Sequence, residues 1–241
     1  MIKDPYVYEE TNVLKNISNI KDQTKLDDYE TTMVNLGIIK LLKSNFKINK
    51  VEDIFIIHKV LFENVYEWAG EKRIINISKS EPILNGLSVI YTDVSDIENE
   101  LIKVQNKIDN IKWNSLSENE MIQQTVIVIS RIWQVHSFRE GNTRVVTLFL
   151  YYFLKHLGLV INRDFINRHA KYFRNALVLA SIGKYSEYSH LEKILKDSIH
   201  FYATGEQEHS NYKTINGYDL DKYQYNYHQL NNKKSIDEFS E

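Results

Sequence analysis

The chain has 241 residues and a formal net charge of −2, and 43% of its residues are hydrophobic and 26% charged. These values match ordinary globular proteins, so they exclude a largely disordered chain and leave no broad basic field for binding nucleic acid. The chain has no cysteine, which excludes disulfides and thiolate metal sites but does not distinguish a cytoplasmic protein from a secreted effector.

The amino-acid sequence favours one all-α domain. Two prolines and eight glycines are too few for the turns of an all-β fold, and 241 residues suffice for one well-buried core. No apolar run has the length of a signal peptide at the start of the chain, and none approaches the ~20 residues of a membrane span. We therefore expect a cytoplasmic protein with no membrane partner.

The first two predicted helices cover residues 25–45 and 51–68. In the first, apolar residues recur at three- and four-residue spacing, which predicts that they face the core. These residues are Leu26, Tyr29, Met33, Leu36, Ile39 and Leu42. The second helix is expected to end at Gly70, because glycine readily takes the left-handed conformation found after helices.

Residues 71–92 combine β-branched residues with Pro82 and Gly86, which predicts a short hairpin or an extended arm. Helical spacing returns over residues 93–111. The segment from Ser117 to Glu120 then has the form of a capping box and predicts the start of a helix that runs to His136.

The two most apolar helices are predicted at residues 121–135 and 144–157, and both belong in the middle of the domain. Two further helices, over residues 163–182 and 186–203, are separated near Gly183. From Gly205 the composition becomes polar and rich in tyrosine, so residues 205–241 are expected to form a solvated tail.

Between the two apolar helices lies His136-Ser-Phe-Arg-Glu-Gly-Asn-Thr-Arg144. The start of a helix has free backbone N–H groups and a partial positive charge, so a loop that leads into one is suited to bind phosphate. Gly141 allows close approach of the backbone to an anion, and Arg144 can form paired hydrogen bonds to phosphate oxygens. Glu140 can bind a divalent cation, and His136 can accept a proton.

This loop resembles the signature of the Fic family, His-x-Phe-x-(Asp/Glu)-Gly-Asn-x-Arg, at all six fixed positions. The resemblance continues in Tyr66–Arg73 with Ile75–Lys79, in Thr11–Asn16 and in Phe173–Leu177, and so covers roughly residues 5 to 200. It implies an all-α Fic fold, a helical bundle with a small β-hairpin flap at about 71–92. The Fic domain would span residues 1–204, with an N-terminal helical extension and a core at about 50–200.

The resemblance also implies an activity, the Mg2+-dependent transfer of AMP from ATP to Ser, Thr or Tyr hydroxyls of a target protein. It implies that His136 is the general base, that Glu140 binds Mg2+, and that the backbone N–H groups of Gly141–Thr143 surround the β-phosphate. The Asn142 side chain would contact the α-phosphate, and Arg144 the outer phosphates. Each residue also has an ordinary structural alternative: a helix-terminal histidine, a surface carboxylate or a salt-bridged arginine.

The flap would align the target chain by strand pairing. By resemblance, the residues that do so are Ile75, Asn76, Ile77 and Ser78. An ordinary two-stranded hairpin is the alternative. Asn175 would face the nucleotide base, with an exposed helix surface as the alternative, and Phe138 is expected to anchor the loop onto the core.

Three positions depart from the commonest form of the signature: Ser137 replaces proline, Thr143 replaces glycine and Thr147 replaces a second arginine. Thr143 adds a Cβ atom that disfavours a positive φ. Thr147 matters most, because a neutral hydroxyl cannot replace an arginine clamp on the γ-phosphate. This leaves the identity of the nucleotide open. A lysine at position 143 would mark the kinase-like branch of the family, so Thr143 favours AMP transfer.

Several alternatives stay open. The chain is either this transferase, a related enzyme that transfers another nucleotide or phosphate-containing group, or a helical binding module that has lost turnover. A metal hydrolase is a weaker alternative, since no third ligand accompanies His136 and Glu140. No clean inhibitory motif is present, so an antitoxin partner is one candidate regulator. The tail between Tyr218 and Tyr227 is a candidate for self-modification, and a plain polar surface is the alternative.

Overall fold

The computed structural model describes residues 4–203, together with Tyr218 and Leu220. Their regular structure is helical, as predicted, and their one β-pairing is an isolated bridge between Val7 and Leu14. The helices in chain order are α1 (Gln23–Lys43), α2 (Asp53–Phe62), η1 (Pro82–Leu84), α3 (Ile97–Asn110), η2 (Trp113–Ser115), α4 (Glu118–Val135), α5 (Asn142–His156), α6 (Arg163–Arg168), α7 (Ala170–Leu179), η3 (Gly183–Tyr185) and α8 (Ser189–Ala203).

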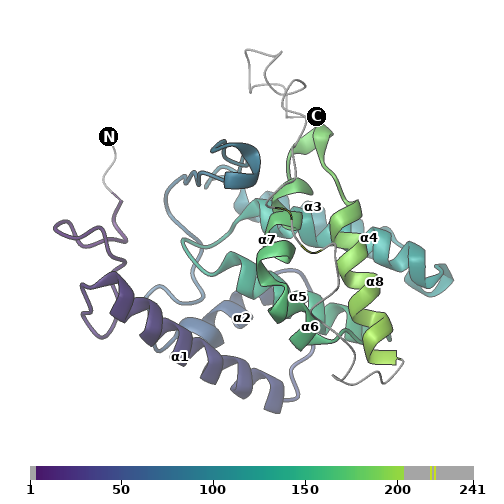
Figure 1. Cartoon of the computed structure of the whole chain (residues 1–241), viewed down its shortest axis with the longest axis horizontal. Coiled ribbons are helices and arrows are strands. Elements are labelled where there is room, and N and C mark those ends of the chain that lie inside the picture. Colours follow the sequence, from purple (N-terminus) through teal and green to yellow (C-terminus); the bar gives the residue numbers. More distant parts are fainter. Residues whose placement is uncertain (1–3, 204–217, 219, 221–241) are drawn as a thin grey trace.

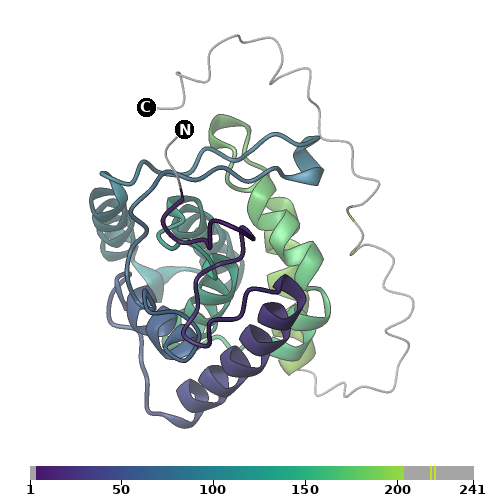
Figure 2. The same cartoon turned by 90° about the vertical axis from the view of Figure 1, so that its left-hand side faces the viewer.

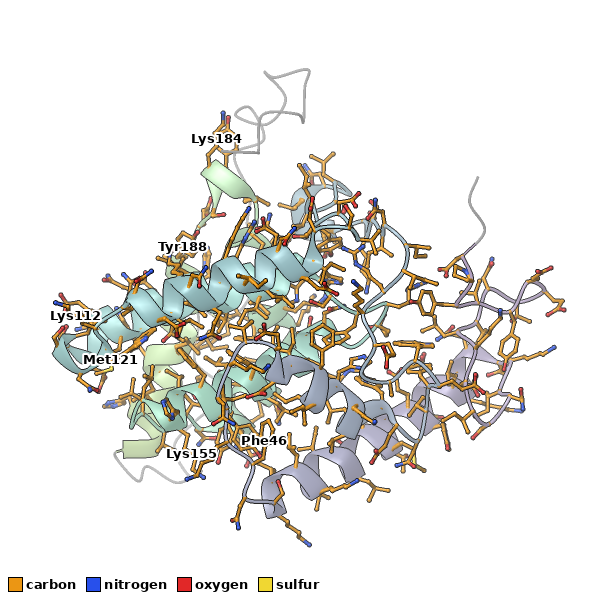
Figure 3. The ribbon with its side chains drawn as sticks, turned by 180° about the vertical axis from the view of Figure 1, so that it is seen from behind. Phe46, Lys112, Met121, Lys155, Lys184 and Tyr188 are labelled. Atoms are coloured by element: carbon orange, nitrogen blue, oxygen red, sulfur yellow. The ribbon has the colours of Figure 1, made fainter. Side chains whose placement is uncertain are left out.

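Helices α4 and α5 form the centre of the molecule, as their apolar sequences predict. Helix α4 packs against α3, α5, α7 and α8, while α5 packs against α2 and α4. Figure 1 shows α1 and α2 on one side of α5 and α8 on the other. The predicted capping box at the start of α4 is present, with Ser117 and Glu120 exchanging hydrogen bonds. Viewed from behind, Lys112 and Met121 mark the end of the molecule where α3 leads into α4 (Figure 3).

Helix α1 packs with a different register from the one predicted. Its buried residues are Leu26, Val34, Gly37 and Leu41, whereas Leu36, Ile39 and Leu42 are 54%, 47% and 36% exposed. The physical reason is Gly37. A Cβ atom there would lie 2.6 Å from the Val60 carbonyl oxygen, so the bare Cα lets α1 approach the backbone of α2 closely. This crossing fixes which face of α1 is buried.

Two predicted helix boundaries were wrong. Helix α2 ends at Phe62 and not near Trp68, and turns lead to Gly70, whose φ is +85°. The segment predicted as one helix over 163–182 is two helices, because His169 leaves helical geometry with φ −108° and ψ 28° and ends α6 where α7 begins. No proline or glycine marks that break. The predicted break near Gly183 is present as η3.

Residues 71–92 form an arm of two extended limbs that run alongside each other to η1 (Figure 2). The arm has the outline of the predicted flap, but no β-ladder joins its limbs within the described residues. At the base, Asn76 Oδ1 accepts the Val94 N–H at 2.8 Å. At the tip, the Glu81 N–H donates to the Leu87 carbonyl at 3.0 Å. Contacts at its two ends therefore hold the arm in shape.

The predicted tail, residues 205–241, lies outside the described residues except at Tyr218 and Leu220. Leu220 is buried, and the Tyr218 ring stacks on His169 with centroids 4.3 Å apart. The Tyr218 hydroxyl donates to Asp197 on α8. Tyr218 therefore contacts α8 and the junction between α6 and α7. Among the described helices, none combines the length and the apolar character that crossing a membrane requires.

Candidate active site

The motif loop is folded by two residues with left-handed backbone. Helix α4 ends at Val135, and His136 then takes φ 51° and ψ 54°. Gly141 takes φ 85° and caps α5, which starts at Asn142. A non-glycine residue in the left-handed region is uncommon and costs about 1 kcal/mol or more, so the surrounding structure must hold His136 in place.

The His136 ring is 2% exposed and stacks on Tyr91, with ring centroids 3.9 Å apart. Its Nδ1 lies 3.1 Å from the Trp133 carbonyl oxygen. Because a carbonyl only accepts, Nδ1 must carry the proton, and Nε2 keeps its lone pair. Within the described residues, Nε2 is buried without a hydrogen-bond partner.

Burial, followed by the charge of Lys79, lowers the pKa of His136 to about 3. The ring is therefore neutral at pH 7 and can accept a proton at Nε2. Negative phosphate oxygens beside the ring would favour its charged form and raise this pKa. His136 thus has the tautomer that a general base needs, while its pKa of about 3 lies below the near-neutral range that suits proton transfer at pH 7.

Arg73 holds His136 and the loop in position. This fully buried side chain donates from Nε to the His136 carbonyl at 2.8 Å, and its backbone N–H donates to the Ser137 carbonyl at 2.8 Å. The same guanidinium donates to the carbonyls of Ile75 and Thr92, one on each limb of the arm. A single side chain therefore joins the motif loop to both limbs.

Glu140 lies between two cations. Its Oε1 accepts the Gly141 N–H at 2.9 Å and lies 3.9 Å from Arg144, while its Oε2 lies 3.2 Å from Lys79 Nζ. Burial alone would raise the pKa of Glu140, but Lys79, the Gly141 N–H and Arg144 outweigh it and lower the pKa to about 2. The carboxylate is ionised and about one-third exposed. Such a group suits Mg2+, which takes one or two carboxylates plus substrate phosphates and water.

A buried histidine of α2, His58, supports the loop from beneath. Its Nδ1 accepts the Gly70 N–H at 2.8 Å, so its Nε2 carries the proton and donates to the Glu140 carbonyl at 3.2 Å. The ring also stacks on Phe138 with centroids 4.0 Å apart. Burial lowers the pKa of His58 to about 3. Phe138 is buried, which confirms the prediction that it anchors the loop.

The Asn142 side chain closes the loop. Its Oδ1 accepts the Phe138 N–H at 3.0 Å and its Nδ2 donates to the Phe138 carbonyl at 2.8 Å. Its contact with an α-phosphate stays a prediction. The predicted conflict between the Thr143 Cβ and a positive φ does not arise, because Gly141 takes the positive φ and Thr143 lies inside α5. Its hydroxyl oxygen accepts from Trp133 Nε1 at 2.9 Å.

Arg144, which the resemblance assigns to the outer phosphates, and Thr147, which replaces the second arginine, are both engaged within the protein. Arg144 Nη2 pairs with Glu30 of α1 at 2.6 Å, and its guanidinium lies 4.9 Å from the centre of the Phe62 ring. The salt bridge that the sequence left as the alternative for Arg144 is thus present. The Thr147 hydroxyl donates to the Thr143 carbonyl at 2.7 Å and so bonds to its own helix.

The arm carries the four predicted target-docking residues. Exposure alternates along this limb, with Asn76 and Ser78 exposed and Ile75 and Ile77 half-buried, as in a strand at the edge of a sheet. The arm tip is fixed to α7, since the buried Glu81 forms paired hydrogen bonds with Arg174 at 2.7 and 2.9 Å. Asn175, the residue predicted to face the base, follows Arg174 in α7 and is half-buried.

Sequence reasoning missed much of what surrounds the motif. It gave no role to Glu30, His58, Arg73, Lys79 or Glu81, although Arg73 and Lys79 stand inside segments that carry the resemblance. These residues come from α1, α2 and the arm, at least 59 positions before Glu140. Only a three-dimensional arrangement brings them to the loop. The described residues contain no cluster of three His, Asp or Glu side chains able to hold a metal, so Glu140 lacks protein co-ligands there.

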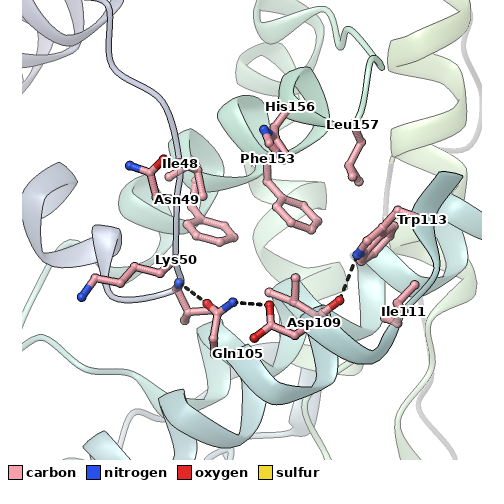
Figure 4. Close-up of a pocket in the computed structure, with 13 residues that line it drawn as sticks. Ile48, Asn49, Lys50, Gln105, Asp109, Ile111, Trp113, Phe153, His156 and Leu157 are labelled. Carbon is pink, nitrogen blue, oxygen red and sulfur yellow. Dashed lines mark hydrogen bonds between the residues drawn. The ribbon is translucent and has the colours of Figure 1, made fainter.

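A cavity of about 230 Å³ lies near the end of α5, away from the motif (Figure 4). Its lining includes Trp113, Phe153, His156 and Gln105. The lining residue of α5 nearest the motif loop is Phe149, about 10 Å along the helix from Asn142 at ~1.5 Å per residue, and no residue of the loop lines the cavity. The cavity is therefore separate from the loop.

Comparison with known proteins gives one family model and several relatives that this chain resembles. Residues 48–154 match the model of the Fic/DOC family. The chain is 28% identical over 169 residues to the protein adenylyltransferase VbhT of Bartonella schoenbuchensis, which is 68% of this chain but 34% of VbhT. It is 27% identical over 182 residues to a probable protein adenylyltransferase, y4lH, of Sinorhizobium fredii, covering 76% of this chain and 90% of y4lH.

Solved structures show the fold. The BepC protein of Bartonella tribocorum, with bound AMPPNP, superposes with a TM-score of 0.67 at 21% identity, over 80% of this chain and 95% of that one. A Fic domain of Bartonella quintana with bound ADP gives the same TM-score at 21% identity, over 80% and 93% of the two chains. Residues 48–154 therefore resemble the Fic/DOC family, and the described helical chain has the Fic fold.

Proposed function

We propose that the chain is a protein adenylyltransferase that transfers AMP from ATP to a side-chain hydroxyl of a target protein. The observation that carries this proposal is His136 Nε2, a buried nitrogen with a free lone pair, in the loop that leads into α5. The names of the relatives support the same reaction class. Because the chain spans only about a third of VbhT, the activity of a whole relative is not transferred to it.

The proposed reaction assigns one task to each residue. A Ser, Thr or Tyr hydroxyl oxygen of the target attacks the α-phosphorus of ATP, and His136 Nε2 takes the hydroxyl proton. The bond between the α-phosphorus and the bridging oxygen breaks, and pyrophosphate leaves with that oxygen. The start of α5, Gly141 to Arg144, binds the phosphates.

Glu140 is the residue that would hold Mg2+, because its carboxylate is ionised and partly exposed and its Oε2 is bound by a lysine that can move away. When bound, the ion supplies positive charge beside the phosphates. The arm, at Ile75 to Ser78, would position the target by pairing with the open edge of this limb. We extend the domain to residues 1–204, with the N-terminal helix α1 packed on it.

The test uses ATP labelled at the α- or the γ-phosphate, with Mg2+, and follows label on the protein and on proteins of a cell lysate. We expect label from the α position only, reduced by a factor of about 10² to 10⁴ in His136→Ala. The control is His156→Ala, an exposed histidine at the far end of α5, which should leave labelling unchanged. Label from the γ position would instead show kinase chemistry, and equal labelling by His136→Ala would remove the proposed base.

Thr147 favours a second candidate, the transfer of another nucleotide or phosphate-containing group, since its hydroxyl is bound within α5 and adds no charge. Competition of other nucleotides against labelled ATP separates the two. A binding module without turnover would bind nucleotide and transfer no label at all.

We also propose that the protein acts in the cytoplasm or as an effector, that an antitoxin partner regulates it, and that its own tyrosines are targets. Mass mapping of the labelled chain tests the last of these.

A further inference from the structure

Lys79 is the one residue of the arm that reaches the motif carboxylate. Its ammonium lies 3.2 Å from Glu140 Oε2, and the two side chains are 30% and 32% exposed. Its backbone N–H donates to the Ser88 hydroxyl at 3.2 Å on the opposite limb, which fixes where the side chain starts. A half-exposed ion pair of this kind contributes little to stability, so a purely structural role does not account for its position.

The other cations around the loop already have partners. Arg144 is paired with Glu30 at 2.6 Å, Arg174 with Glu81 at 2.7 Å, and the buried Arg73 donates to carbonyl groups. Within the described part of the chain, Glu140 is the one partner of the Lys79 ammonium. Any cation that binds Glu140 therefore competes with this lysine.

We propose that Lys79 is a phosphate-binding residue that leaves Glu140 when a nucleoside triphosphate and its divalent cation enter, and then binds the outer phosphates. Lysine is suited to this exchange, because its charge sits at the end of a flexible four-carbon chain. The ammonium supplies the positive charge that Thr147 does not provide, from the arm and not from α5. This inference rests on the proposed function for the reaction but concerns binding alone.

The role has a signature that a structural ion pair would not produce. A cation that contacts only the outer phosphates strengthens the binding of ATP and leaves the binding of AMP unchanged. Removing the charge of Lys79 should therefore weaken the binding of ATP about tenfold or more, since a charge-assisted hydrogen bond is among the stronger polar contacts. A substitution that only loosens the arm would instead weaken the binding of ATP and of AMP by the same factor.

The experiment measures equilibrium binding of ATP and of AMP, each with Mg2+, to proteins that carry His136→Ala so that no transfer occurs. Lys79→Met should lose about tenfold in affinity for ATP and less than twofold for AMP, and Lys79→Arg should keep most of the affinity. Lys72→Met is the matched control, since Lys72 lies on the same limb and pairs at 2.6 Å with Glu98, away from Glu140. Melting temperatures confirm that every variant folds.

Three outcomes decide the matter. A loss of affinity for ATP but not for AMP in Lys79→Met, absent in Lys72→Met, supports the proposed role of Lys79 in binding the outer phosphates. Unchanged affinities, or equal losses of ATP and AMP, overturn it while leaving the proposed function standing. If the protein without the Lys79 substitution binds no ATP, the proposed function fails and this role fails with it.

Discussion

Gly141 meets two constraints at a single residue of the motif. Its φ is +85°, and a Cβ atom on it would lie 2.4 Å from two ring carbons of Phe62. Phe62 is fully buried at the end of α2, so its ring has little room to move. The glycine of the motif is therefore required by packing as well as by any approach of a phosphate.

We expect Gly141→Ala to destabilise the fold by about 2 to 4 kcal/mol, combining backbone strain with overpacking against Phe62. The matched control is Gly158→Ala, where φ is +82° but no atom lies within 4 Å of the added Cβ, so only the backbone cost of about 1 kcal/mol applies. Urea unfolding measures both. Equal losses in the two variants would show that Phe62 adjusts without cost.

At the scale of elements, the crossing of α1 and α2 decides the position of Glu30. A Cβ atom on Gly37 would lie 2.6 Å from the Val60 carbonyl oxygen and 2.9 Å from the Leu61 Cα, and backbone atoms inside a helix cannot yield. The same helix α1 carries Glu30, which binds Arg144 and accepts a hydrogen bond from the Tyr66 hydroxyl. Displacing α1 should therefore disturb Arg144.

We predict that Gly37→Ala destabilises the protein by about 1 to 3 kcal/mol, although alanine is favoured over glycine in a helix by about 1 kcal/mol. Asn35→Ala, on the exposed face of α1, is the control that gains helix propensity without a clash. Urea denaturation compares the two variants with the parent. A Gly37→Ala variant as stable as Asn35→Ala would mean that the two helices are not as close as described.

Sequence periodicity predicted the helices better than it predicted their faces. Apolar spacing located α1, but three of its predicted core residues, Leu36, Ile39 and Leu42, are exposed, because the close approach at Gly37 turns a different face inward. Local signals placed the start of α4 at Ser117, since a capping box involves residues only three apart. No local signal marks the break between α6 and α7 at His169.

In the candidate site, too, the sequence predicted the local part and not the residues that distant segments contribute. The motif residues from His136 to Arg144 were identifiable because they are contiguous, and the fold brings His136 and Glu140 to one loop. Their supports come from distant segments: Arg73 holds the His136 carbonyl and His58 holds the Glu140 carbonyl. A single sequence carries no signal for such long-range hydrogen bonds.

At the scale of the whole molecule, two buried histidines, His58 and His136, make stability depend on pH. Burial lowers the pKa of each to about 3, from an ordinary value of 6.5. Both are neutral in the folded protein above pH 3 and take up protons on unfolding below pH 6.5. Their contribution to stability is therefore complete above about pH 6.5 and is lost as the pH falls toward 3.

Each histidine should lower the free energy of unfolding by up to about 1.4 kcal/mol per pH unit across this window. Urea unfolding at pH 7, 6 and 5 measures the slope. His58→Gln keeps one donor and one acceptor for the Glu140 carbonyl and the Gly70 N–H but does not titrate, so its slope should be shallower by about one proton. His156→Gln, at an exposed position, should keep the full slope. An unchanged slope in His58→Gln would contradict the prediction.

The double attachment of Arg73, to the His136 carbonyl and to both limbs of the arm, would link the two proposed binding events, that of a target at the arm and that of a nucleotide at the loop. Through this link, a target chain that stabilises one position of the arm would change the free energy of the backbone at His136. A nucleotide bound at the loop would in turn change the free energy of the arm. Linkage requires the two effects to be equal, so a nucleotide that alters affinity for a target by some factor has its own affinity altered by the same factor. One buried guanidinium would thus couple the choice of target to the occupancy of the nucleotide site.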